Sequence, residues 1–137
     1  MKNGILFYII LFLTLVTSQI LVFNQLELGL GIHIMVYPMF ILLLPFDSRP
    51  VSLMFIAFVT GLAVDWYTNS FGLHTSSAVF LAYIRPRLFS ILEPRDGYDV
   101  LKKPLIRDMG RKWFMTIYLA ALAVHHFWFF LFEIFKF

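Results

Sequence analysis

Asp65 and His74 are the residues whose types and spacing most clearly allow chemistry in this chain. A carboxylate beside an imidazole can form a charge-assisted hydrogen bond that fixes a proton or a ligand. Each belongs to a row of small residues spaced by four positions: Ala57, Gly61 and Asp65 in one row, and His74, Ala78 and Ala82 in the other. Because such rows let helix backbones approach closely, the sequence predicts one polar seam between two helices.

Several interpretations of this pair remain open on the sequence alone. Asp65 and His74 could bond to each other at the outer end of the seam, or Asp65 could be a helix-end carboxylate among lipid headgroups. Together with His33 they could also form an outer polar cluster that binds a ligand, Zn²⁺ or a proton. We expect the structural bond, and we assign no catalytic residue, no metal ion and no cofactor.

His125 and His126 are a second titratable pair within an apolar run. Adjacent residues of a helix point about 100° apart, so the two rings cannot easily face one ligand. We expect one of them to face the helix bundle and to bond a neighbour, with proton relay as the alternative.

Motifs of known enzyme chemistry are absent from the sequence. It contains no cysteine, which excludes disulfides and thiolate chemistry. It also has no HExxH, GxSxG, Walker A or GxGxxG pattern. We therefore do not expect an enzyme.

The elements that must position these residues are membrane helices. The 137 residues are 61% hydrophobic and 14% charged, against about 25% charged in soluble domains. We predict an all-α, polytopic transmembrane bundle forming a single integral membrane domain over 1–137. Its five helices are expected over 4–23, 30–46, 51–66, 71–86 and 113–135. Pro38 should kink the second helix, and the third and fourth are short enough that a re-entrant hairpin is an alternative.

Charge is concentrated between the fourth and fifth helices. Residues 85–112 hold eight of the eleven Lys and Arg residues but only four of the eight Asp and Glu residues. Because loops rich in Lys and Arg stay in the cytoplasm, this places the loop 87–112 and the N-terminus inside. The expected location is therefore a membrane that the chain crosses several times.

The same loop is the candidate partner surface. Its expected contact residues are Arg85, Arg87, Arg95, Lys102 and Lys103. The alternative for the Arg85-Pro86-Arg87 segment is a cationic stop that extends to the lipid headgroups. The basic charge also predicts contact with anionic membrane lipids, and we expect no nucleic-acid partner.

Three motifs in order resemble the MreD family of rod shape-determining membrane proteins. They are LLLPFD at 42–47, GLAVDWYTNSFGLH at 61–74 and AYIRP at 82–86; the turn EPRDGY at 93–98 and the 103–104 region resemble one bacterial subgroup. The resemblance covers roughly residues 30–130. It implies six helices in a full-length member, so the chain is expected to be truncated or to lack its last helix.

The resemblance implies a non-catalytic scaffold of the cell-wall elongation machinery, located in the bacterial cytoplasmic (inner) membrane. Its implied partners are MreC, the glycosyltransferase RodA with its penicillin-binding transpeptidase, and MreB, directly or indirectly. The family fold is similar to the substrate-binding components of energy-coupling-factor transporters. That similarity provides the alternative: a subunit that binds a small, vitamin-like molecule for a membrane transporter.

Overall fold

The computed structural model describes residues 2–21, 35–70, 72–99 and 102–135 of the chain. Over these residues all regular secondary structure is helical, which confirms the all-α expectation for this part of the chain. The helices are α1 (Lys2–Leu21), α2 (Pro38–Leu42), α3 (Pro50–Thr68), α4 (Leu73–Ile91), α5 (Ile106–Met109) and α6 (Arg111–Ile134).

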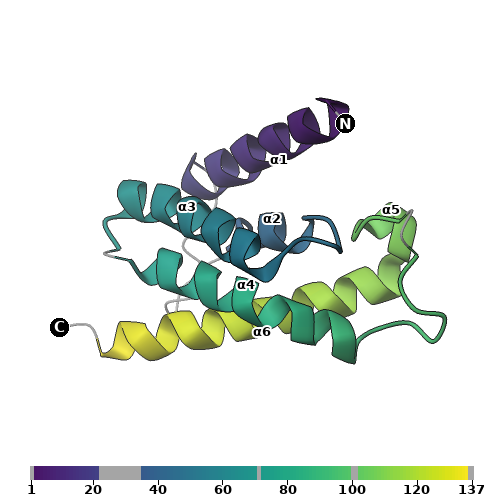
Figure 1. Ribbon diagram of the computed structural model, residues 1–137. Coiled ribbons are helices and arrows are strands. Elements are labelled where there is room, and N and C mark those ends of the chain that lie inside the picture. Colours follow the sequence, from purple (N-terminus) through teal and green to yellow (C-terminus); the bar gives the residue numbers. More distant parts are fainter. Residues whose placement is uncertain (1, 22–34, 71, 100–101, 136–137) are drawn as a thin grey trace.

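The helices α3 and α4 form the centre of the bundle (Figure 1). They run antiparallel and pack on each other more extensively than any other pair, while α6 packs on α4 from the other side. The short helix α2 contacts α1, α3, α4 and α6. Tyr37 and Ile41 are completely buried there, so the segment around α2 is a core element and not a peripheral one.

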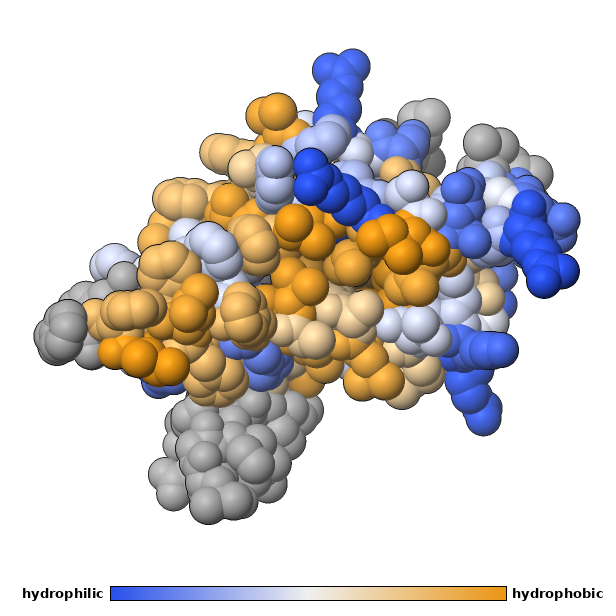
Figure 2. Space-filling view, turned by 90° about the horizontal axis from the view of Figure 1, so that it is seen from below, coloured by the Kyte–Doolittle hydropathy of each residue, from blue (hydrophilic) through white to orange (hydrophobic). Residues whose placement is uncertain are grey.

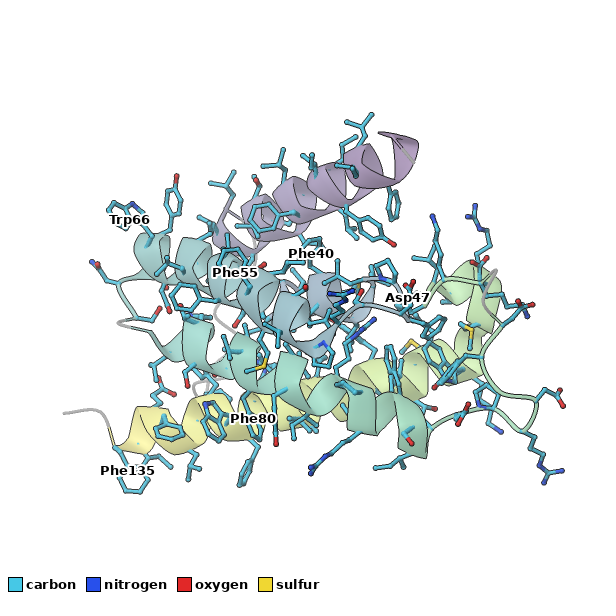
Figure 3. All side chains as sticks on the ribbon, in the orientation of Figure 1. Phe40, Asp47, Phe55, Trp66, Phe80 and Phe135 are labelled. Atoms are coloured by element: carbon cyan, nitrogen blue, oxygen red, sulfur yellow. The ribbon has the colours of Figure 1, made fainter. Side chains whose placement is uncertain are left out.

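In the described part of the chain, three helices are long and apolar enough to cross a membrane: Gly4–Leu21 in α1, Pro50–Thr68 in α3 and Arg111–Ile134 in α6. Many of their large apolar side chains point away from the bundle. Phe55 is 69% exposed and Trp66 80% exposed, and Figure 3 shows Trp66 at the end of α3 away from Asp47. Water would penalise this apolar surface heavily, and these helices therefore indicate a membrane protein.

The segment expected as the helix 30–46 is much less helical than predicted. Its residues 30–34 lie outside the described part of the chain, and of 35–46 only Pro38–Leu42 is helical. Pro38 occupies the first turn of α2, where its missing N–H costs nothing, so it begins a helix instead of kinking one. Pro45 then lies in the turn that leads to α3.

The fourth helix is longer than predicted, because α4 continues through Pro86 to Ile91. Proline weakens a helix by removing one hydrogen bond and crowding the preceding turn, but the residues beyond Pro86 are held by tertiary contacts, because the carbonyls of Phe89 and Leu92 accept bonds from Tyr98 and Trp113. The cytoplasmic loop that we expected over 87–112 therefore begins as helix and becomes irregular at Leu92.

Polar and apolar residues separate along the length of the molecule. Figure 2 shows hydrophilic residues gathered at one end and hydrophobic residues over the rest of that face. The polar end holds the turn 43–49 and the segments 87–99 and 102–112, where seven Lys and Arg residues outnumber four Asp and Glu residues, and the N-terminal end of α1 lies on the same side (Figure 1). It is termed the basic end below. Figure 3 shows Asp47 toward this end, with Trp66 and Phe135 at the other.

Candidate functional site

Asp65 and His74 are in direct contact. The Oδ1 atom of Asp65 lies 3.0 Å from Nδ1 of His74 and accepts the backbone N–H of His74 at 3.0 Å. Its Oδ2 atom accepts the backbone N–H of Thr75 at 2.9 Å and the Thr75 hydroxyl at 2.5 Å. Both backbone donors belong to the first turn of α4, which has no side-chain cap of its own. Asp65 therefore caps α4 from the neighbouring helix. Its negative charge also interacts favourably with the positive, N-terminal end of the α4 dipole.

The two rows of small residues line the contact between α3 and α4. Ala57, Ala78 and Ala82 are completely buried. Gly61 faces the start of α4: a Cβ atom added to it would lie 2.8 Å from the carbonyl oxygen of His74 and 2.8 Å from the backbone nitrogen of Thr75. Any larger residue at position 61 must push α3 and α4 apart, which would pull Asp65 away from the α4 amides.

The seam is not arranged for nucleophilic catalysis. The Ser70 hydroxyl lies 2.8 Å from Nδ1 of His74, the same ring nitrogen that faces Asp65. A Ser–His–Asp triad needs the serine on one ring nitrogen and the carboxylate on the other. The hydroxyl of Thr68 also bonds to Ser70, so the group forms a small closed polar network at the end of α3.

A second buried polar layer lies beneath this network. The Tyr37 hydroxyl is 2.5 Å from Nε2 of His125 and 3.2 Å from the carbonyl oxygen of His74. His125 is completely buried, and its Nδ1 atom has no hydrogen-bond partner among the described residues. His126 instead lies near the carbonyl of Leu122, at 2.9 Å within its own helix. One histidine faces the bundle and bonds a neighbour, as the sequence predicts.

The outer polar cluster cannot be assembled from the described residues. His33 lies outside them, so its position relative to Asp65 and His74 stays a prediction. Among the residues that the structure describes, no group of three or more His, Cys, Asp or Glu side chains is arranged to hold a metal ion.

Arg85 requires a correction. We expected it at the surface, either in contact with a partner or extended to the headgroups, but it is only 2% exposed. Its Nη2 group donates to the carbonyl oxygens of Leu42, Leu44 and Pro45, with the Pro45 bond at 3.3 Å. These carbonyls follow or end α2 and lack helical partners, so a buried guanidinium satisfies them. Arg85 is part of the bundle interior and presents no surface to a partner protein.

The other four predicted contact residues are exposed. Arg87 lies on the last turns of α4, while Arg95, Lys102 and Lys103 lie between α4 and α5. The Nζ atom of Lys103 lies over the ring of Phe7, 5.7 Å from its centroid, and so connects the basic end to α1. The guanidinium of Arg87 similarly lies 5.9 Å from the ring centroid of Tyr83. Arg87, Arg95 and Lys102 are nevertheless exposed and can reach a partner.

Aromatic residues hold the basic end against the bundle. The rings of Phe46 and Tyr98 stack with centroids 4.6 Å apart, and both contact Phe89 and Trp113. The Tyr98 hydroxyl donates to the carbonyl of Phe89 at 2.5 Å, and the Trp113 indole donates to the carbonyl of Leu92 at 3.1 Å. Burial raises the pKa of Tyr98, so its hydroxyl stays protonated and can donate.

Sequence reasoning missed Tyr37, the particular partners of Gln19 and the burial of Arg85. Gln19 is completely buried on α1, and its Oε1 atom accepts the backbone N–H groups of Val36 at 2.6 Å and of Tyr37 at 3.4 Å. The burial of Arg85 could have been predicted from the row of His74, Ala78 and Ala82. Position 85 is three residues after Ala82 and therefore lies on the same buried face of the helix. For Gln19 and Tyr37 no comparable local pattern exists.

No protein-family description, curated protein or solved structure matches this chain. The fold and the site by themselves define a helical membrane protein with a buried polar seam and a basic end.

Proposed function

We propose that this chain is a non-catalytic scaffold of the bacterial cell-wall elongation machinery, as its resemblance to MreD implies. In this proposal the basic end lies in the cytoplasm, the N-terminus is inside, and the bundle binds MreC and links wall synthases to MreB. The alternative is a small-molecule-binding subunit of a membrane transporter.

The observation that carries the proposal is the fixed geometry of the basic end. Tyr98 and Trp113 each donate a hydrogen bond to a carbonyl at the end of α4, and Phe46 packs between them. A scaffold must present its contact groups in a defined arrangement, because ordering a mobile loop on binding would lower its affinity. The exposed cations of a loop fixed in this way favour a protein or lipid partner of opposite charge.

Two cavities in the apolar part of the bundle suit the scaffold better than the transporter subunit. One cavity of about 630 Å³ lies between α1 and α3, and another of about 570 Å³ is lined by α3, α4 and Trp128. Their walls are almost entirely apolar, whereas a site for a vitamin-like molecule needs several convergent polar groups. Apolar grooves of this kind suit lipid chains or partner helices.

A complementation experiment tests the role of the exposed cations. In a rod-shaped bacterium that lacks its own MreD, we expect the wild-type chain to restore rod shape. The test variant neutralises three exposed cations of the predicted set: Arg87→Gln, Arg95→Gln and Lys102→Gln. We expect this variant to lose rod shape and to bind MreC about tenfold more weakly, a change of about 1.4 kcal/mol.

A matched control separates binding from net charge and topology. It neutralises three other cations near the start of α6: Arg107→Gln, Arg111→Gln and Lys112→Gln. Membrane topology is mapped in both variants with an impermeant label. The proposal for this surface is contradicted if both variants fail equally, or if the test variant keeps rod shape with unchanged topology.

A further inference from the structure

Arg85 is a buried cation without a carboxylate partner. No Asp or Glu oxygen of the described residues lies within 4.0 Å of its guanidinium, in contrast to the contact between Asp65 and His74. Its Nη2 group bonds to carbonyls, but its Nε atom is buried and has no hydrogen-bond partner among the described residues. A buried charge that lacks a counter-ion is costly, so an anion beside Arg85 would stabilise the folded protein.

A cavity next to Arg85 can hold such an anion. It has a volume of about 280 Å³ and opens at the basic end, where Ser90 and Glu93 join Arg85 on its wall. Pro86 and the rings of Phe46, Phe89 and Tyr98 complete the lining. If α1, α3 and α6 span a bilayer, the end of α4 lies at the depth of the lipid headgroups. The cavity is large enough for a headgroup and too small for a whole lipid.

We propose that this cavity binds the phosphate-containing headgroup of a membrane phospholipid, with phosphatidylethanolamine preferred. The guanidinium of Arg85 suits the phosphate, because guanidinium N–H groups bind phosphate oxygens strongly. Glu93 on the same wall carries the opposite charge and can accept N–H bonds from a primary ammonium group. Choline has no N–H to donate, and a glycerol headgroup has no positive charge, so both should bind less well. The inference is independent of the proposed scaffold role.

Native mass spectrometry of the purified protein tests the site. The delipidated chain is titrated with phosphatidylethanolamine, phosphatidylglycerol and phosphatidylcholine, each presented in the same detergent. We expect one molecule of phosphatidylethanolamine to be retained at least tenfold more tightly than either other lipid. Free phosphoethanolamine and inorganic phosphate are titrated in parallel. If free phosphoethanolamine bound as tightly as phosphatidylethanolamine, the site would recognise a soluble phosphate compound and the proposal of a lipid ligand would be wrong.

Two exposed positions provide variants that should fold normally. Glu93→Gln should remove the preference for phosphatidylethanolamine, about tenfold, and leave phosphatidylglycerol binding unchanged. Ser90→Phe should fill the cavity and abolish retention of all three lipids, with helicity by circular dichroism unchanged. Glu133→Gln, an exposed carboxylate near the end of α6, is the control and should behave as wild type. Equal retention of the three lipids by the wild-type chain, or an unchanged preference in Glu93→Gln, would overturn the proposal.

Discussion

Gln19 and Arg85 bind the backbone at opposite ends of α2. The amide oxygen of Gln19 accepts the N–H groups of Val36 and Tyr37 just before the helix, and the guanidinium of Arg85 donates to carbonyls just after it. Irregular backbone inside a membrane protein is tolerated only where its polar groups are satisfied. The two side chains therefore allow a five-residue helix to lie at the centre of an apolar bundle.

Replacing Arg85 should be the most damaging single change of those considered. Arg85→Ala leaves the carbonyls after α2 without donors and removes the packing of the guanidinium on Phe89, whose ring centroid is 4.4 Å away. We expect a loss of about 3 kcal/mol in the free energy of unfolding. Thermal unfolding in detergent, followed by circular dichroism, measures it. The control Arg87→Ala removes an exposed cation two residues away; if both variants unfold at the same temperature, Arg85 does not support α2.

Gln19→Leu tests the other end of α2. Leucine keeps most of the volume of glutamine but cannot accept the N–H groups of Val36 and Tyr37, which become unpaired. Each buried unpaired donor costs about 1–3 kcal/mol, and we expect a loss in that range in the same assay. Thr17→Val changes a polar residue on the exposed side of α1 and should leave stability unchanged. A wild-type melting temperature for Gln19→Leu would show that these amides find other partners.

Asp65→Asn tests the cap that α3 provides to α4. The carboxylate accepts from His74 with one oxygen and from Thr75 with the other, whereas an amide must turn an NH₂ group toward one of these donors. We expect a loss of about 2 kcal/mol, because the bonds are charge-assisted and oppose the helix dipole. Asp47→Asn, at an exposed carboxylate, is the control. Equal thermal stability of Asp65→Asn and wild type would remove the case for the cap.

Gly61→Ala tests the close approach of α3 and α4. The added methyl group would meet the backbone of His74 and Thr75 and force the helices apart, at a cost of about 1–3 kcal/mol. Gly4→Ala is the matched control, because a Cβ atom at this helical position meets nothing within 4 Å. Alanine is the better helix former, so the control should be neutral or slightly stabilising. A neutral Gly61→Ala would mean that the seam has room for a methyl group.

The seam could be predicted from the sequence because its signal is local. Rows of small residues at intervals of four identify the face of each helix, and the short link after Thr68 makes α3 and α4 antiparallel neighbours. The partners of α2 could not be predicted in this way. Gln19 is 17 and 18 positions away from the backbone groups that it binds. Arg85 is 40 to 43 positions away from the carbonyls that it binds. No periodic pattern in the sequence encodes such distant contacts.

The positions of the helix ends were harder to predict for a related reason. Proline shows where a helix is weakened, but whether it begins, interrupts or only perturbs the helix depends on the groups that satisfy the neighbouring backbone. Pro38 begins α2 and Pro86 lies inside α4. The predicted surface position of Arg85 was wrong for the same reason. A charged side chain is expected to contact water or lipid headgroups, but unpaired carbonyls within the bundle bind this guanidinium instead.

Affinity capture from cells tests the proposed scaffold most directly. The full chain, carrying a tag, is solubilised from a rod-shaped bacterium in mild detergent, and the proteins that co-purify are identified by mass spectrometry. We expect MreC to co-purify with the wild-type chain. In the variant with Arg87, Arg95 and Lys102 replaced by Gln, we expect the yield of MreC to fall about tenfold. Co-purification with the ATPase and transmembrane subunits of a transporter, without MreC, would contradict the proposed scaffold role.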